Sequence, residues 1–162
     1  MQTARISLVQ PLQDDYDDIL SLHNHDEVRK YLGGPVVSKD FERSFQNMLS
    51  PKKPNMHWVV RNIESDAFMG LVSIDEYHDG KRYEMSYQLL PGYWGKGYAQ
   101  EVCKRIIEYA FNEAGFDQIV SETQMRNESS INLLERLGMK LESTVERFGE
   151  QQAVYVLKDT NS

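Results

Sequence analysis

The chain has 162 residues, of which 40% are hydrophobic, and it contains one cysteine. This length fits one domain, and one cysteine cannot form an internal disulfide. The net charge of -7 and the pI near 5.1 argue against a general nucleic-acid or anionic-membrane surface and are compatible with a cationic substrate. We therefore expect a single domain over residues 1–162, located in a reducing cytoplasm, with no nucleic-acid or membrane partner.

The predicted elements alternate between strands and helices along the whole chain. The first part contains a strand at 5–9, helical pieces at 14–23 and 27–31, a turn at 33–35 and a helix from 38 to about 49. The second part contains strands at 57–61, 68–75, 83–90 and 118–123, a long helix from 99 to near 115, a helix from about 129 to 137 and a hairpin of 140–146 with 153–158. This order predicts an α/β (α+β) domain with a mixed sheet flanked by helices.

The most informative stretch is Gly92-Tyr93-Trp94-Gly95-Lys96-Gly97-Tyr98-Ala99, which joins a predicted strand to the long helix. A helix start leaves several backbone N–H groups unpaired, and the helix dipole favours negative charge there. Gly95 and Gly97 carry no side chain to block a pyrophosphate. A phosphate-binding loop is one interpretation, and a simple packing turn is the other. The stretch lacks the spacings G-x-x-x-x-G-K-[ST] and G-x-G-x-x-G, which disfavours a nucleotide triphosphatase or a dehydrogenase.

A second segment, Asn127 to Gly138, runs from the end of a strand through a capped helix to a glycine stop. Together with the glycine stretch at this separation, it resembles the GNAT superfamily of acetyl-coenzyme A-dependent N-acetyltransferases. The branch is similar to ribosomal-protein alanine N-acetyltransferases, and the matching elements cover most of the chain. The resemblance implies an acyltransferase with a mostly antiparallel sheet of about seven strands, in which a central pair of strands, 84–90 and 118–123, splays apart.

The resemblance also implies where acetyl-CoA binds. Pantetheine would pair with the backbone near Leu89 and Leu90, and the other cofactor-binding positions are Trp94, Gly95, Lys96, Gly97, Tyr98, Ala99, Asn127 and Ser130. Trp94 departs from the superfamily pattern, which usually has Gln or Arg at this place, although an aromatic residue is typical of the ribosomal branch. Lys96 is then the nearby candidate for a side-chain charge on the pyrophosphate. For Asn127, stabilisation of the strand-to-helix turn is the alternative role.

The implied chemistry is direct attack of a neutral amine on the acetyl carbonyl, with no covalent acyl-enzyme. Glu84 is the candidate catalytic base, and an ordinary exposed strand residue is the alternative. A backbone N–H near Leu90 is expected to stabilise the oxyanion. Ser130 is expected to bond coenzyme A or to help protonate the departing thiolate, whereas helix capping by Ser130 or Ser129 is the alternative.

Other residues are given mainly structural or supporting roles. Cys103 falls on the apolar face of the long helix, so we expect it to be buried and not nucleophilic. Tyr87, on the other strand face from Glu84, either lines the thioester or belongs to the core. The four histidines lack metal-like spacing, so no metal is expected. By family analogy, the region from His23 to Pro35 and Trp58 are expected to shape the acceptor pocket.

The amine acceptor is the least defined part of this prediction. A terminal α-amine with a pKa of about 7.7–8.0 needs little help to lose its proton near pH 7, whereas an amine with a pKa of about 10.4 costs roughly 3–4 kcal/mol more to neutralise. The branch resemblance favours a protein N-terminal α-amine, with a small amine such as an amino acid, polyamine or drug as the main alternative. A non-catalytic coenzyme A-binding sensor is a third hypothesis. The chain is expected to act as a monomer or a homodimer.

Overall fold

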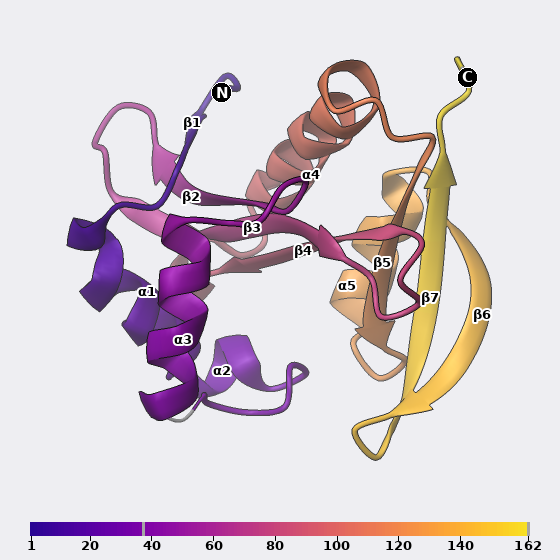
Figure 1. Cartoon of the computed structure of the whole chain (residues 1–162), viewed down its shortest axis with the longest axis horizontal. Helices are drawn as coiled ribbons and strands as arrows, with labels where there is room; N and C mark the ends of the chain where they lie inside the picture. Colours follow the sequence, from indigo (N-terminus) through magenta and orange to yellow (C-terminus); the bar gives the residue numbers. More distant parts are fainter. Residues whose placement is uncertain (37, 162) are drawn as a thin grey trace.

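The structure, a computed structural model, describes residues 1–36 and 38–161 (Figure 1). The helices, including the short helices η1 to η3, are η1 (Gln13–Asp15), α1 (Tyr16–His23), α2 (Asp26–Arg29), α3 (Ser38–Leu49), η2 (Pro91–Tyr93), α4 (Tyr98–Glu108), η3 (Tyr109–Glu113) and α5 (Glu128–Arg136). The strands are β1 (Ile6–Val9), β2 (Met56–Asn62), β3 (Phe68–Glu76), β4 (Tyr83–Leu89), β5 (Gln118–Gln124), β6 (Lys140–Arg147) and β7 (Glu150–Lys158). These bounds agree with the sequence-based prediction to within a few residues.

The seven strands form one sheet in the order β1-β2-β3-β4-β5-β7-β6. Every neighbouring pair is antiparallel except β4 and β5, which run parallel. The long connection through α4 joins these two strands, as a parallel pair requires. The predicted fold class, a mixed and mostly antiparallel sheet flanked by helices, is confirmed.

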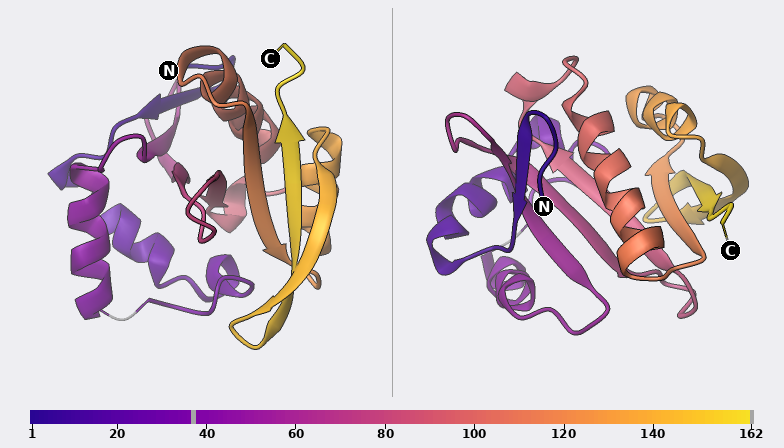
Figure 2. Two further views of the ribbon diagram at one scale, coloured as in Figure 1. Left: turned by 45° about the vertical axis from the view of Figure 1, so that its right-hand side comes forward. Right: turned by 90° about the horizontal axis from the view of Figure 1, so that it is seen from above.

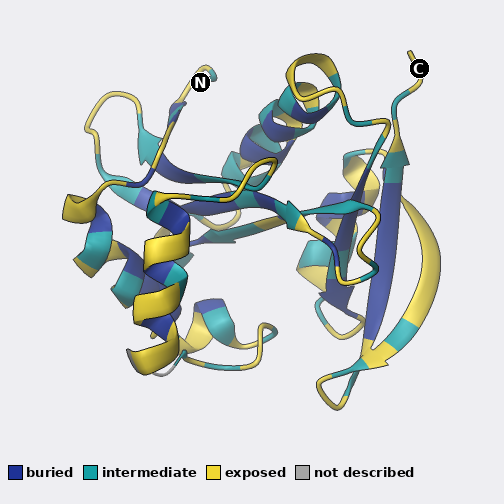
Figure 3. Cartoon of the chain, in the orientation of Figure 1, coloured by how far each residue is buried: buried dark blue, intermediate teal, exposed yellow. Residues whose placement is uncertain are grey.

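Helices cover both faces of the sheet. Figures 1 and 2 show α4 on one face of strands β2 to β4 and α1 with α3 on the opposite face. The largest cluster of buried side chains lies on the α4 side and includes Cys103 and Ile106, which point from α4 toward the sheet. A second cluster joins Phe41 and Phe45 of α3 to Leu71 of β3. The buried inner and exposed outer faces of α3 in Figure 3 follow this packing.

A glycine sets the close approach of β3 and β4. A Cβ atom built on Gly70 would lie 2.0 Å from the backbone oxygen of Gln88 in β4. Such a contact is impossible without moving a strand, so glycine is required there. Gly70 therefore helps to fix the position of β4, the strand that carries most of the site described below. Within the described residues, no helix combines the length and the apolar character needed to cross a membrane.

Candidate functional site

Strands β4 and β5 diverge at the centre of the sheet. Within the described residues, their backbone register runs through a single pair, Glu84 with Val120. One residue further along each strand, the Ser121 hydroxyl donates to the Met85 carbonyl at 2.8 Å. Past this point a cavity of about 980 Å³, here called the main cavity, opens between the strands, and it also reaches the start of α4, α5 and the loop after α2. The expected splayed pair of strands is confirmed.

The backbone groups of β4 face the main cavity only at alternate residues. The Leu90 N–H donates to the Met69 carbonyl and the Tyr77 N–H donates to the Arg82 carbonyl, both at 2.8 Å. Neighbouring residues in a strand direct their backbone groups to opposite edges, so even-numbered residues here face β3 and Leu89 faces away from it. We expected an oxyanion-stabilising N–H near Leu90; the N–H of Leu90 itself is already bonded, so the N–H of Leu89 is the nearest one on the other edge of the strand. Leu89 lines the main cavity and Leu90 does not.

The glycine loop places the start of α4 at the main cavity. Gly97 is the N-cap residue of α4 and has a left-handed backbone with φ of +82°. Gly95 also has a positive φ, +72°, and a Cβ atom added to it would meet open space. The loop residues that line the main cavity are Tyr93, Trp94, Gly95, Gly97, Tyr98 and Ala99. The unpaired N–H groups of the first turn of α4 and its dipole suit this end of the cavity to an anion.

Lys96, the predicted side-chain charge for the pyrophosphate, is bonded within the loop. Its ammonium group donates to the Gly92 carbonyl at 3.0 Å, and it does not line the main cavity. Arg5 instead brings a cation to the loop: its Nη1 donates to the Lys96 carbonyl at 3.1 Å, and its guanidinium lies 4.1 Å from the centre of the Tyr98 ring. Glu101 of α4 holds Arg5 through an ion pair of 2.8 Å. Arg5 was missed because the loop lies 91 residues away from it in the sequence.

Trp94 ties the loop to the end of β4. Its indole Nε1 donates to the Leu89 carbonyl at 2.8 Å, and the residue is 47% exposed. The Leu89 carbonyl points toward the main cavity, so the indole occupies one of its two lone pairs. Trp94 therefore replaces a charged side chain at this place with a hydrogen bond that positions the loop.

Two hydroxyl groups meet where α5 begins. Asn127 is the N-cap residue of α5, and its side chain accepts the N–H of Ser130 at 3.2 Å. The capping role considered for Ser129 or Ser130 thus belongs to Asn127. The Ser130 hydroxyl is 2.7 Å from that of Tyr87, and both residues line the main cavity. Burial raises the pKa of Tyr87, which keeps its phenol protonated near pH 7.

Three cations also line the main cavity: Arg29, Lys30 and Arg136. Arg29 donates to the Leu32 carbonyl at 2.8 Å and to the Gly34 carbonyl at 2.9 Å, so it shapes the loop after α2. Arg29 and Lys30 fall within the region from His23 to Pro35 that the family analogy assigned to the acceptor pocket. No sequence pattern marked Arg136 as a site residue, because a basic residue is common in the last turn of any α-helix.

Glu84 lies on the sheet face opposite α4, between two other carboxylates. Its Oε2 accepts the backbone N–H of Glu122 at 3.2 Å, and its register partner on β3 is Asp75. Burial, followed by the negative charge of Glu122, raises the pKa of Glu84 to about 7. Glu84 lines neither cavity itself, but Glu122 lines the main cavity and Asp75 lines a smaller one.

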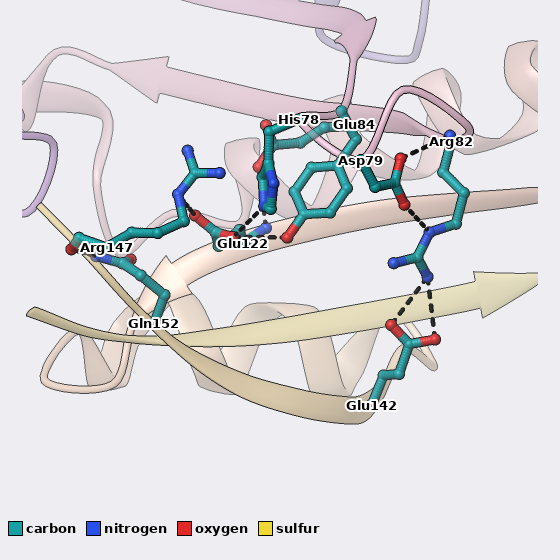
Figure 4. Close-up of polar contacts among 9 residues, drawn as sticks. His78, Asp79, Arg82, Glu84, Glu122, Glu142, Arg147 and Gln152 are labelled. Carbon is teal, nitrogen blue, oxygen red and sulfur yellow. Dashed lines mark hydrogen bonds and ion pairs between the residues drawn. The ribbon is translucent and has the colours of Figure 1, made fainter.

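Glu122 is held in place from several sides (Figure 4). Its Oε1 accepts the Tyr77 hydroxyl at 2.6 Å and lies 3.4 Å from Nε2 of His78. Its Oε2 lies 3.3 Å from Nε of Arg147. These partners come from the β3–β4 turn and the β6–β7 hairpin, so the tertiary fold fixes the carboxylate beside Glu84.

The second cavity, of about 210 Å³, lies on the sheet face opposite α4 and is here called the small cavity. Its walls come from strands β2, β3 and β4 and helices α1 and α3, and Ser86, Tyr87 and Gln88 line both cavities. Of the region from His23 to Pro35 that we expected to shape the acceptor pocket, His23 lies in the wall of the small cavity and residues 27–32 line the main cavity. Trp58 lines neither cavity: it is 5% exposed and packs in the large core, with its ring 5.1 Å from that of Tyr109.

Cys103 is buried in the large core, as expected, and burial raises the pKa of its thiol. Both facts disfavour a nucleophilic role, because the thiolate is the reactive form. Within residues 1–36 and 38–161, no group of three or more histidine, cysteine or acidic side chains is arranged to hold a metal ion.

Comparison with known proteins adds an independent line of evidence. The family model described as acetyltransferase (GNAT) domain matches residues 5–140. Among curated proteins, uncharacterized N-acetyltransferase YoaA of Bacillus subtilis is 24% identical over 156 residues, covering 91% of this chain and 86% of that protein. Uncharacterized protein YkkB of the same organism is 28% identical over 106 residues, which cover 64% of this chain but only 62% of the relative.

Solved structures share the fold. The crystal structure of spermidine N-acetyltransferase from Vibrio cholerae in complex with CoA and spermine superposes with a TM-score of 0.84 at 20% identity and covers 96% of each chain. At this identity the likeness shows the fold alone.

Proposed function

The chain belongs to the acetyltransferase (GNAT) domain family, and we propose that Glu84 accepts the proton of a primary amine that enters from the small cavity. As a GNAT enzyme the protein is an N-acetyltransferase that uses acetyl-CoA. The observation that carries the proposal is the position of Glu84, a buried carboxyl group with a pKa of about 7 that lies between the linings of the two cavities.

The main cavity fits acetyl-CoA in size and chemistry. Its volume of about 980 Å³ is at the upper end for a ligand pocket. The loop around Gly95 and Gly97 and the start of α4 would hold the pyrophosphate, with Trp94, Tyr98 and Ala99 around it. The remaining lone pair of the Leu89 carbonyl would accept an N–H of pantetheine, and Asn127 and Ser130 would contact the same ligand from α5.

The proton on the incoming ammonium must leave before its nitrogen can attack. Acetyl-CoA supplies the thioester, whose carbonyl carbon bonds to the amine nitrogen as the carbon–sulfur bond breaks. Glu84 takes the amine proton, directly or through one water, and a base with a pKa near the working pH is the most effective. The Glu122 carboxylate beside it favours approach of the cation.

Two groups that line the main cavity would stabilise the negative charges that develop on the carbonyl oxygen and on the sulfur. The Leu89 N–H points away from β3 toward the main cavity and would donate to the developing oxyanion. Ser130 would donate its proton to the thiolate, the Tyr87 hydroxyl, 2.7 Å away, would restore it, and Tyr87 would regain a proton from solvent. The proton taken by Glu84 returns to solvent and completes the cycle.

The size of the small cavity favours a small-molecule acceptor over a protein N-terminus. Its 210 Å³ between three strands and two helices suits a compact amine better than an extended peptide. An amine panel assayed by release of free thiol, together with mass spectrometry of ribosomal proteins with and without the enzyme, tests this choice. Acetylation confined to a protein N-terminus would reverse it, and tight acetyl-CoA binding without turnover of any amine would favour the sensor hypothesis.

Glu84→Gln tests the proposed base. We expect kcat to fall by roughly 10²- to 10⁴-fold, because the variant keeps the shape of the side chain but cannot accept a proton. In the wild type, kcat at saturating amine should rise with pH through about 7 as Glu84 ionises, and the variant should lose this inflection. Glu108→Gln, at a side chain that is 63% exposed on α4, is the matched control. A retained rate and inflection in Glu84→Gln would exclude Glu84 as the base.

A further inference from the structure

The polar groups that line the small cavity include a buried oxygen without a partner. The side-chain oxygen Oε1 of Gln88 is buried and has no hydrogen-bond partner among the described residues. An unsatisfied buried acceptor costs about 1–3 kcal/mol, so native proteins rarely leave one without a donor. Gln88 lies on the β4 face that carries Glu84, and it lines the small cavity. A donor is therefore expected inside this cavity.

The two histidines of the small cavity have defined tautomers. Nδ1 of His23 lies 3.0 Å from the Ile19 carbonyl, and a carbonyl only accepts, so Nδ1 carries the proton. Burial lowers the pKa of His23, so its ring is neutral near pH 7 and its Nε2 is an acceptor. Nε2 of His57 lies 2.9 Å from Oδ1 of Asp75, so this nitrogen donates and is already used.

The lining of the small cavity therefore has an excess of acceptors over donors. Oε1 of Gln88 and the free nitrogen of His23 are acceptors without a partner, and Asp75 adds a carboxylate, while the hydroxyls of Ser73 and Ser86 can either accept or donate. No lysine or arginine is among the described residues that line it. The complementary group carries several N–H donors, no acceptor and a positive charge, which is the description of an alkylammonium group.

We propose that the small cavity binds a second, protonated amine of the acceptor, so that the substrate is a linear aliphatic diamine or polyamine. This inference rests on the proposed entry of the acceptor from the small cavity. Glu84 and Gln88 lie on one face of β4, four residues apart, which corresponds to roughly 13 Å. Asp75 is opposite Glu84 across the strand pair, but its carboxylate bonds His57, whose register partner is Ser73, so it is directed along the cavity between Glu84 and Gln88. The reacting amine lies at Glu84 while the second ammonium lies among Asp75, His23 and Gln88.

A pair of matched amines tests the second charge. With saturating acetyl-CoA, 1,4-diaminobutane should exceed n-butylamine in kcat/KM by at least about 100-fold, because the monoamine leaves the acceptors of the small cavity unpaired. 4-Aminobutanol, which replaces the second ammonium with a neutral hydroxyl, should resemble n-butylamine. Equal kcat/KM for all three compounds would overturn the inference and leave the acetyltransferase proposal standing. Absence of turnover with every amine would instead contradict the proposed function.

Variants locate the second ammonium. Gln88→Leu and Asp75→Asn should each lower the diamine-to-monoamine ratio of kcat/KM by about tenfold or more, whereas Asp117→Asn, at an exposed carboxylate in the turn before β5, should leave the ratio unchanged. An unchanged melting temperature shows that each variant is folded. Calorimetry with 1,4-diaminobutane and the CoA-saturated protein measures the affinity of the site for the diamine without turnover. Diamine affinity that is the same in the wild type, Gln88→Leu and Asp75→Asn would refute the site.

Discussion

At the scale of single residues, the environment of Glu84 decides its chemistry. A strand position with an acidic residue is ordinarily an exposed one, and the sequence left both interpretations open. The fold removes Glu84 from solvent and places it beside Glu122 and opposite Asp75, while Arg147 lies near enough to offset part of their charge. The result is a carboxyl group that changes its charge near neutral pH, where an exposed glutamate would already be ionised.

The same raised pKa predicts a pH-dependent cost to stability. Between its ordinary pKa of 4.5 and about 7, the folded chain holds a proton on Glu84 that the unfolded chain releases. The contribution of Glu84 to the free energy of unfolding therefore falls as pH rises through this window, by up to about 3 kcal/mol.

Glu84→Gln removes this titration. We expect the variant to gain stability relative to the wild type from pH 4.5 to pH 7, with a constant difference above pH 8, as measured by urea unfolding at several pH values. Glu108→Gln should follow the wild type throughout. A difference that does not vary with pH would show that Glu84 ionises normally in the folded state.

At the scale of elements, the sequence predicted which segments form strands and helices but not which edge or face each residue occupies. Leu89 and Leu90 are adjacent and equally apolar, and only the register of β3 with β4 reveals that Leu90 bonds β3. Trp58 lies in a strand buried on both faces, so periodicity cannot assign its direction. The glycine loop was predictable because its chemistry is local. Arg5 and Glu122 act through distant partners, and no local pattern marks them.

The loop before α4 offers a test with a structural control. Gly97→Ala places a side chain on a left-handed residue, which costs roughly 1–2 kcal/mol, and its Cβ atom would lie 3.5 Å from the Arg5 guanidinium. Gly115→Ala carries a similar backbone cost, at φ of +76°, with nothing within 4 Å. Both variants should lose comparable stability, but only Gly97→Ala should weaken coenzyme A binding, by about tenfold or more in calorimetry. Equal affinities in the two variants would disprove the pyrophosphate assignment for the loop.

At the scale of the whole molecule, the proposed function puts the two substrates on opposite faces of the sheet. Acetyl-CoA, an anionic donor, would bind in the main cavity beside α4 and α5, and the cationic amine would bind in the small cavity on the other face. The net charge of -7 adds a long-range attraction for the cation and a repulsion for the anion.

Ionic strength should therefore affect the two substrates differently. Raising it from about 0.01 M to 0.15 M shortens the Debye length from roughly 30 Å to 8 Å. We expect kcat/KM for the cationic amine to fall several-fold, whereas kcat/KM for acetyl-CoA should not fall. Steady-state assays that vary each substrate in turn measure this. A parallel decrease for both would indicate a general salt effect on the enzyme.

The bond between Trp94 and the Leu89 carbonyl also gives the protein an optical reporter. The chain has two tryptophans, and Trp58 is shielded in the core while Trp94 is half exposed at the edge of the main cavity. A ligand that inserts beside Leu89 must share or displace the indole N–H, which changes the polarity around the ring. The fluorescence emission of Trp94 in a Trp58→Phe background would therefore report the binding of acetyl-CoA in real time, without a label and without catalysis.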